Sequence, residues 1–131
     1  MSKRFKNWKY PFVKSFKSIP YADYLGLMGM ASVLIGNSSS GIIEAPSFHL
    51  PVINIGNRQE GRERSTNVID VNYGEREIIK AVKKTLYDEK FRAMVKKCRN
   101  PYGDGKASQR IVKILGKIKI TPPLLQKKIR Y

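Results

Sequence analysis

The residues with the clearest chemistry lie between Val33 and Pro46, in a segment that reads Val-Leu-Ile-Gly-Asn-Ser-Ser-Ser-Gly-Ile-Ile-Glu-Ala-Pro. An apolar run typical of a buried strand ends at Gly36, and a short helical pattern begins after Gly41. Backbone N–H groups at the start of a helix are unpaired and favour negative charge. Glu44 follows one turn later, where its carboxylate can accept hydrogen bonds from sugar hydroxyls. The segment therefore predicts a nucleotide or nucleotide-sugar site.

A second polar loop, residues 56–67, follows the next apolar run and carries Arg58, Arg62 and Arg64. An arginine presents a permanent charge and paired N–H donors to phosphate oxygens. A turn of small polar residues beside such a loop suits a pyrophosphate, provided that the fold brings the two loops to one edge.

Short buried strands that alternate with helices predict this arrangement. We expect strands at 33–35, 51–55 and 68–71, and helices at 20–28, 42–48, 75–86, 89–97 and 108–115, with Pro46 making the second helix irregular. Such an alternation indicates βαβ units, so the expected fold class is α/β, a Rossmann-like parallel sheet flanked by helices. Ligands bind beyond the carboxyl ends of such strands, where both loops would lie. In the helix at 75–86, we expect an inward face of Ile78, Ile79, Val82 and Leu86.

Other kinds of site fit the sequence less well. The spacing of Gly36 and Gly41 around the serines does not match the Gly-x-Ser-x-Gly nucleophile elbow, and the single histidine, His49, is expected to pack or bond at a turn. The Walker A lysine and the Gly-x-Gly-x-x-Gly fingerprint are absent from the sequence. One cysteine and one histidine cannot form a metal cluster, so we expect neither metal nor cofactor.

Two features of the sequence indicate the cellular compartment of the protein: it has a single cysteine, and it lacks a long apolar run. Cys98 cannot form an internal disulfide, which favours a reducing cytoplasm. Neighbouring cations could lower the pKa of its thiol, but an inert cysteine in the core or on a helix surface is the favoured interpretation. No apolar run reaches the ~20 residues that a membrane helix needs.

The formal charge of +16 allows an alternative function, because such a surface attracts polyanions. The basic residues crowd the N-terminal arm and the region from Lys80 to Arg130, whereas residues 21–57 contain neither Lys nor Arg. The predicted site is therefore not itself the basic patch. A solvated surface, or one that faces an acidic partner domain, is favoured over nucleic-acid binding, which stays the alternative.

Four motifs in this order resemble UDP-N-acetylglucosamine 2-epimerases: Ile19-Pro-Tyr-x-x-Tyr-Leu, Gly36-Asn-Ser-Ser-Ser-Gly-Ile-Ile-Glu-Ala-Pro46, Asn54-Ile-Gly-Asn-Arg-Gln-Glu-Gly-Arg-Glu63 and Asn100-Pro-Tyr-Gly-Asp-Gly105. The third motif is similar to the hydrolysing branch, which releases UDP and N-acetylmannosamine for sialic-acid-type synthesis. The resemblance runs from about Phe16 to Leu115. It implies the C-terminal half of a glycosyltransferase-B fold, with the active site between two Rossmann-like halves.

By motif position, the resemblance implies that Ser38 and Ser39 hold phosphate and that Glu44 holds the ribose hydroxyls. Arg58 would lie at the nucleotide, and Ile19 would meet uracil through its backbone. The family's acid and base carboxylates and its histidine belong to the other half, and His49 does not match that histidine. We therefore expect a truncated or split epimerase without catalytic residues, inactive alone, that binds UDP or UDP-N-acetylglucosamine and is completed by a separate N-terminal half.

The expected organisation has three parts. Residues 1–17 form a basic aromatic arm, residues 18–117 form the UDP-binding domain, and residues 118–131 form a basic tail in which Pro122 and Pro123 end regular structure.

Overall fold

A computed structural model describes residues 10–126, and the expectations for residues 1–9 and 127–131 lie outside that part. Three strands form one parallel sheet in the order β1-β2-β3, namely β1 (Leu34–Gly36), β2 (Val52–Ile55) and β3 (Val68–Val71). Gly36 pairs with Asn54, and Ile55 pairs with Val71, so the three strands end at one edge of the sheet. The predicted fold class, α/β with a parallel sheet flanked by helices, is confirmed.

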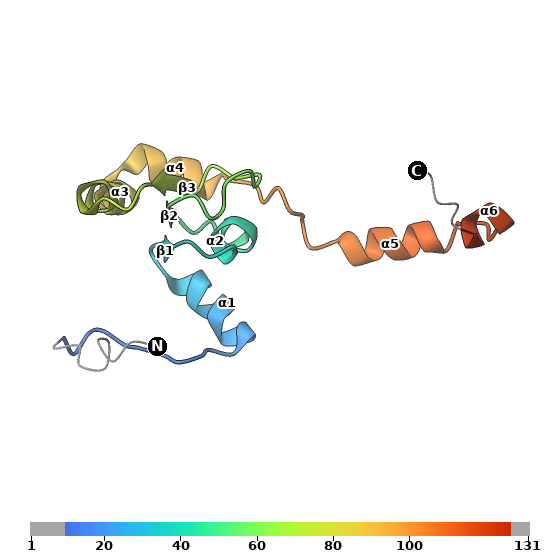
Figure 1. Ribbon diagram of the computed structural model, residues 1–131, viewed down its shortest axis with the longest axis horizontal. Coiled ribbons are helices and arrows are strands. Elements are labelled where there is room, and N and C mark those ends of the chain that lie inside the picture. Colours follow the sequence, from blue (N-terminus) through green and yellow to red (C-terminus); the bar gives the residue numbers. More distant parts are fainter. Residues whose placement is uncertain (1–9, 127–131) are drawn as a thin grey trace.

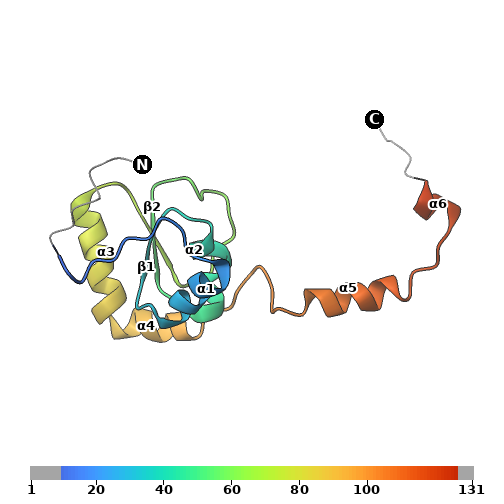
Figure 2. The same ribbon diagram turned by 90° about the horizontal axis from the view of Figure 1, so that it is seen from below.

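Helices cover both faces of this sheet. Figure 2 shows α3 (Glu75–Tyr87) on the opposite side from α1 (Tyr21–Met30) and α2 (Ser40–Ile43), while α4 (Glu89–Lys96) packs beside α3. The central strand is buried on both faces, as its run Val52, Ile53 and Asn54 requires. Asp88 caps α4, because its carboxylate accepts a hydrogen bond from the Phe91 amide at 2.9 Å.

The helix predicted at 42–48 begins earlier and is divided. α2 ends at Ile43, and a 3₁₀ helix, η2 (Ala45–Phe48), continues with Pro46 in its first turn, which is the irregularity expected from proline. A Cβ added at Gly41 would lie 2.8 Å from the Val52 Cγ1, so only glycine lets α2 approach β2 this closely. The main apolar cluster lies on this side of the sheet and contains Met28, Ala45, Leu50 and Val52.

The predicted inward face of α3 is wrong at one position. Ile79 is 46% exposed, whereas the buried residues of this helix are Ala81 and Thr85. Ile78, Val82 and Leu86 are half-buried, as expected. Ile79 precedes Ala81 by two residues, which is about 200° of rotation around the helix, so it faces solvent when Ala81 and Thr85 face the sheet.

The ends of the described chain lie apart from the sheet. Residues 10–20 contain neither helix nor strand, and both views show α5 (Ala107–Leu115) and α6 (Pro122–Leu125) extending away from the sheet (Figures 1 and 2). Pro122 and Pro123 begin α6, so the expectation that they end regular structure is wrong. Proline suits the first turn of a helix, because its fixed φ is helical and its missing N–H is not needed there. The boundaries at residues 17 and 117 stay predictions.

Candidate functional site

The turn between β1 and α2, residues 37–40, carries the predicted serines and is called the serine turn below. The Ser40 hydroxyl donates to the Ser38 Oγ at 2.9 Å and lies 2.8 Å from the Tyr24 hydroxyl of α1. Neither the Ser38 nor the Ser39 amide donates to a residue that the structure describes, so both are free to bind an anion. The serine turn therefore combines three hydroxyls and two free amides at the carboxyl end of β1.

Glu44 lies at the end of α2, directly before η2. Its Oε2 is buried and has no hydrogen-bond partner within residues 10–126. A buried carboxylate oxygen without a donor is costly, and a ligand hydroxyl would satisfy it.

Ile19 is half-buried in the segment that precedes α1, and it lines an apolar groove along that helix with Phe16 and Leu27. The described contacts join Glu44 to the serine turn through α2 but do not bring Ile19 to it.

The loop between β2 and β3, residues 56–67, is called the arginine loop below. Gln59 is only 3% exposed, and its Nε2 donates to the Asn37 carbonyl at 2.8 Å. This hydrogen bond joins the arginine loop to the serine turn across 22 residues of sequence. The two loops that the sequence placed at one edge are thus in direct contact.

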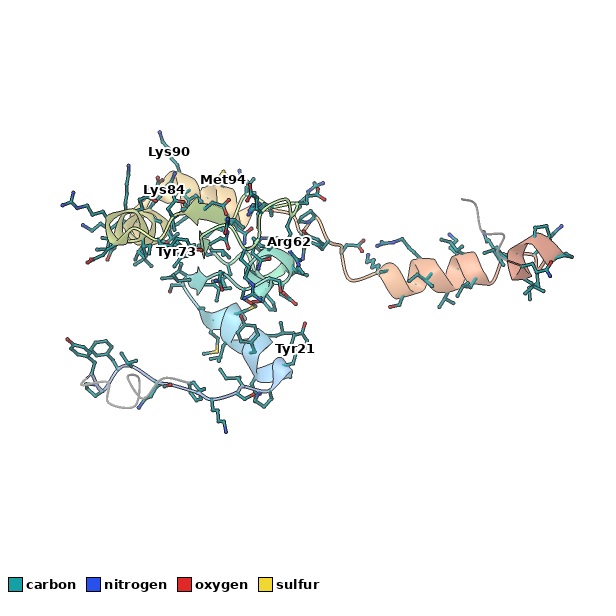
Figure 3. All side chains as sticks on the ribbon, viewed as in Figure 1. Tyr21, Arg62, Tyr73, Lys84, Lys90 and Met94 are labelled. Atoms are coloured by element: carbon teal, nitrogen blue, oxygen red, sulfur yellow. The ribbon has the colours of Figure 1, made fainter. Side chains whose placement is uncertain are left out.

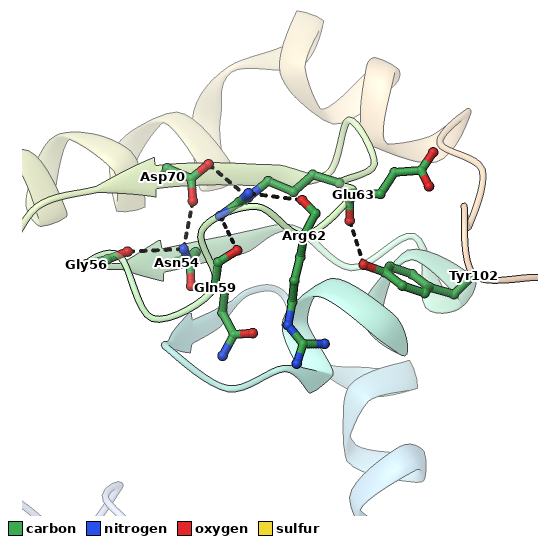
Figure 4. A network of polar contacts seen from close by, with 8 residues as sticks. Asn54, Gly56, Gln59, Arg62, Glu63, Asp70 and Tyr102 are labelled. Carbon is green, nitrogen blue, oxygen red and sulfur yellow. Dashed lines mark hydrogen bonds and ion pairs between the residues drawn. The ribbon is translucent and has the colours of Figure 1, made fainter. Parts of the chain in front are cut away.

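A polar network continues from Gln59 along the strand ends (Figure 4). Arg64 donates to the Gln59 carbonyl at 2.9 Å, and its Nε lies 3.1 Å from Asp70 Oδ2, an ion pair rather than an aligned hydrogen bond. The other oxygen of Asp70 accepts from the Asn54 Nδ2 at 2.7 Å. Because Arg64 neutralises Asp70, it holds the loop in place and is not free for a ligand.

The other two arginines of the loop, Arg58 and Arg62, are exposed. In Figure 4 the Arg62 side chain points from the loop toward the start of α2, beside Gln59. Arg58 and Arg62 are therefore the cations of this loop that can face a ligand, while Arg64 is structural. Sequence reasoning named all three but could not divide their roles, because the pairing of Arg64 with Asp70 arises only from the fold.

Residues 99–102 hold two parts of this site in place through side-chain hydrogen bonds, and the sequence did not predict this role. The Asn100 Nδ2 donates to the Ile43 carbonyl at 2.8 Å and to the Ser47 Oγ at 2.7 Å. The Tyr102 hydroxyl donates to the Glu63 carbonyl at 3.1 Å. This segment, called the clamp below, therefore holds both the α2–η2 region and the arginine loop.

His49 lies at the other end of the sheet, which excludes a triad with the serines. It is in a left-handed conformation after η2 and lines a hollow with Ser32 and Pro51, which precede β1 and β2. Its Nδ1 is 3.6 Å from the Cys98 Sγ, so it packs at a turn as expected. Burial raises the pKa of the Cys98 thiol, and a hydrogen bond with Ser65 opposes this. Cys98 is buried, so its interpretation as a core cysteine is confirmed.

Within residues 10–126, no group of three or more His, Cys, Asp and Glu side chains is placed to hold a metal ion. No helix of this described part is long and apolar enough to cross a bilayer.

Comparisons with known proteins agree with this geometry. The family profile described as UDP-N-acetylglucosamine 2-epimerase matches residues 1–116. A UDP-N,N'-diacetylbacillosamine 2-epimerase (hydrolyzing) of Legionella pneumophila is 40% identical over 118 residues, which are 90% of this chain and 30% of the relative. Polysialic acid biosynthesis protein P7 of Escherichia coli is 40% identical over 110 residues, 84% of this chain and 27% of the relative.

A third relative, the GDP/UDP-N,N'-diacetylbacillosamine 2-epimerase (hydrolyzing) of Campylobacter jejuni, is 54% identical over 57 residues, which are 44% of this chain and 15% of the relative. This chain thus spans less than a third of the length of the curated relatives it matches. The profile match, the parallel sheet and the joined loops lead to one conclusion: the chain belongs to the UDP-N-acetylglucosamine 2-epimerase family and corresponds to a C-terminal fragment of its members.

Proposed function

We propose that this chain binds UDP, or the UDP part of an N-acetylated UDP-hexosamine, between the serine turn and the arginine loop. The observation that carries the proposal is the hydrogen bond from Gln59 to Asn37, because it joins the loop that carries Arg58 and Arg62 to the turn that carries the free amides and hydroxyls. Ser38 and Ser39 would bind the diphosphate together with Arg58. Arg62, which points toward the serine turn, would add a second cation.

The other parts of the nucleotide have candidate partners too. The buried, unpartnered oxygen of Glu44 would accept from the ribose hydroxyls. The backbone of Ile19 would meet uracil, with α1 held near the site by the hydrogen bond between Tyr24 and Ser40. The names of the relatives, which include UDP-N-acetylglucosamine and UDP-N,N'-diacetylbacillosamine 2-epimerases, support a substrate of this class.

We infer that the chain is inactive alone. Removing the proton at the second carbon of the sugar and cleaving its anomeric C–O bond require positioned acids and bases. The groups assigned to the ligand are serines, arginines and the Glu44 carboxylate, which would hold the ribose, and His49 lies at the opposite end of the sheet. A separate N-terminal half would supply the missing groups and exclude water. A cytoplasmic location, which the unpaired cysteine favours, belongs to the same proposal.

The experiment is a calorimetric titration of the full chain with UDP in moderate salt. Arg58→Ala is expected to raise the Kd about ten- to a hundredfold, which is ~1.4–2.8 kcal/mol. Arg92→Ala is the matched control, because Arg92 lies by the hollow at the other end of the sheet and should leave the Kd unchanged. Equal affinities of wild type and Arg58→Ala, with unchanged circular dichroism, would contradict the assignment.

Two further measurements distinguish the competing functions. The isolated chain should release no UDP from UDP-N-acetylglucosamine above background, and turnover that Ser39→Ala abolishes would overturn the inference of inactivity. The relatives do not favour the polyanion alternative. Tight binding of a DNA duplex that weakens steeply with salt, without UDP binding, would restore that alternative.

A further inference from the structure

The clamp completes a ring of hydrogen bonds behind the candidate site. The arginine loop and the serine turn already contact each other directly. The clamp joins them a second time, because Asn100 donates to the Ile43 carbonyl of α2, and the Tyr102 hydroxyl donates to the Glu63 carbonyl of the arginine loop. A site that is held on two sides before the ligand arrives loses less entropy on binding.

Asn100 uses both amide protons and the oxygen of its side chain. Its Nδ2 donates to the Ile43 carbonyl at 2.8 Å and to the Ser47 Oγ at 2.7 Å, and its Oδ1 accepts from the Tyr102 amide at 2.9 Å. Ile43 and Ser47 lie on either side of Glu44, where α2 ends and η2 begins. These two helices have four residues each and are too short to hold the junction by themselves. Asn100 therefore holds the chain on both sides of the carboxylate that we assign to the ribose.

The arginine loop is held by the other residues of the clamp. The Tyr102 hydroxyl donates to the Glu63 carbonyl at 3.1 Å (Figure 4). The Ser65 hydroxyl donates to the Arg99 carbonyl at 2.6 Å. Glu63 directly follows Arg62, which Figure 3 shows beside α2. Tyr102 therefore holds the backbone next to a cation that we assign to the diphosphate.

We propose that Asn100 and Tyr102 are positioning residues for different parts of the nucleotide. Asn100 places Glu44 for the ribose, and Tyr102 places the arginine loop for the diphosphate. In this arrangement neither side chain touches the ligand, and each acts through the segment that it holds. The inference rests on the proposed UDP site, and it requires that the two side chains affect uridine and UDP differently.

The test is a titration of the full chain with UDP and with uridine, followed by the NMR signals of amides in the serine turn and α2. Tyr102→Phe removes only the hydroxyl. It should raise the Kd for UDP about two- to fivefold and leave the Kd for uridine, which has no phosphate, unchanged. Tyr87→Phe is the matched control, because Tyr87 is a 76% exposed tyrosine on α3, on the other face of the sheet.

Asn100→Asp keeps the shape of the side chain and the acceptor for Tyr102, but it cannot donate to the Ile43 carbonyl. It should raise the Kd for uridine about three- to tenfold and the Kd for UDP at least as much, because both ligands carry the ribose. Ser47→Ala removes one of the two bonds of the Asn100 amide without adding a charge, and it should weaken both ligands by equal factors. Gln109→Glu, the same change of amide to carboxylate on exposed α5, should change neither Kd.

Two results would overturn this inference alone: an unchanged Kd for uridine in Asn100→Asp, or equal changes for uridine and UDP in Tyr102→Phe. Hydrogen exchange without ligand adds a readout of structure. Faster exchange should be confined to residues 42–49 in Asn100→Asp and to residues 58–66 in Tyr102→Phe. Faster exchange of the β2 amides in either variant would instead assign that side chain a general structural role. Failure of the wild-type chain to bind UDP would overturn the proposed function itself, so the two failures are distinguishable.

Discussion

Replacing Gln59 by Met tests whether the contact between the two loops prepares the UDP site. Methionine has the length and flexibility of glutamine but cannot donate a hydrogen bond, so the 2.8 Å bond to the Asn37 carbonyl is lost while the buried volume is kept. The lost bond costs ~0.5–1.5 kcal/mol. Asn37 is exposed, so water can hydrate its carbonyl and no further penalty follows.

The same substitution removes an unfavourable group. The Oε1 of Gln59 is buried and has no partner within residues 10–126, and such an orphan acceptor costs ~1–3 kcal/mol. The two contributions oppose each other, so the free energy of unfolding should change by between about −0.5 and about +2.5 kcal/mol. The UDP site, however, loses only the favourable contribution, because its arginine loop must then be ordered by the ligand. The Kd for UDP should rise about two- to tenfold.

The assay is calorimetric UDP titration combined with urea denaturation. Glu60→Gln is the matched control, since Glu60 is the exposed neighbour of Gln59 in the same loop and should leave both quantities unchanged. An unchanged Kd in Gln59→Met, with an unchanged urea midpoint, would refute the idea that this hydrogen bond organises the site. A loss of stability above ~3 kcal/mol would instead show that Gln59 serves the core.

Three other predictions concern single residues. Glu44→Gln should weaken UDP more than it weakens a 2′,3′-dideoxyribose analogue, measured by titration, and equal losses would assign Glu44 a structural role. Gly41→Ala should destabilise the fold by ~1–3 kcal/mol in urea, because its Cβ would meet Val52 at 2.8 Å; an unchanged midpoint would contradict the close approach of α2 to β2. Burial raises the pKa of Cys98 above its ordinary 9.0, so the unfolded thiol ionises first and stability should fall as pH rises from 9.0 through the folded pKa. The urea midpoint of wild type should therefore drop more between about pH 8 and about pH 10 than that of Cys98→Ala, and equal drops would contradict the raised pKa.

The elements at the centre of the fold were predictable, because their sequence patterns admit one structure. The strand predicted at 68–71 has those bounds, and the one predicted at 51–55 begins one residue later. Turn residues bound both apolar runs, and each is too short for a helix. The inward face of α3 was not fully predictable. Ile78 and Ile79 are adjacent, and only the small contact residues of the folded helix decide which of them faces the sheet.

The positions of the two loops of the site were predictable from the sequence, but the side-chain contacts that join them were not. The positions of the two loops follow from the topology of a parallel sheet, which the alternation of strands and helices indicates. The contact of Gln59 with Asn37 and the ion pair of Arg64 with Asp70 depend on tertiary distances that a local pattern does not contain. The residues assigned to the ligand, Ser38, Ser39, Glu44, Arg58 and Ile19, stay predictions until a titration tests them.

The clamp has a consequence for limited proteolysis. It ends at Tyr102, and the exposed stretch that follows contains Gly103 and Gly105, both with positive φ, before α5 begins. Exposed stretches of this kind are favoured sites of protease attack. A cut there would release α5 and leave both loops fastened, whereas a cut before Asn100 would also free the arginine loop and α2. One nick between Gly103 and Gly105 would thus separate α5 from a sheet whose serine turn and arginine loop are still held by the clamp.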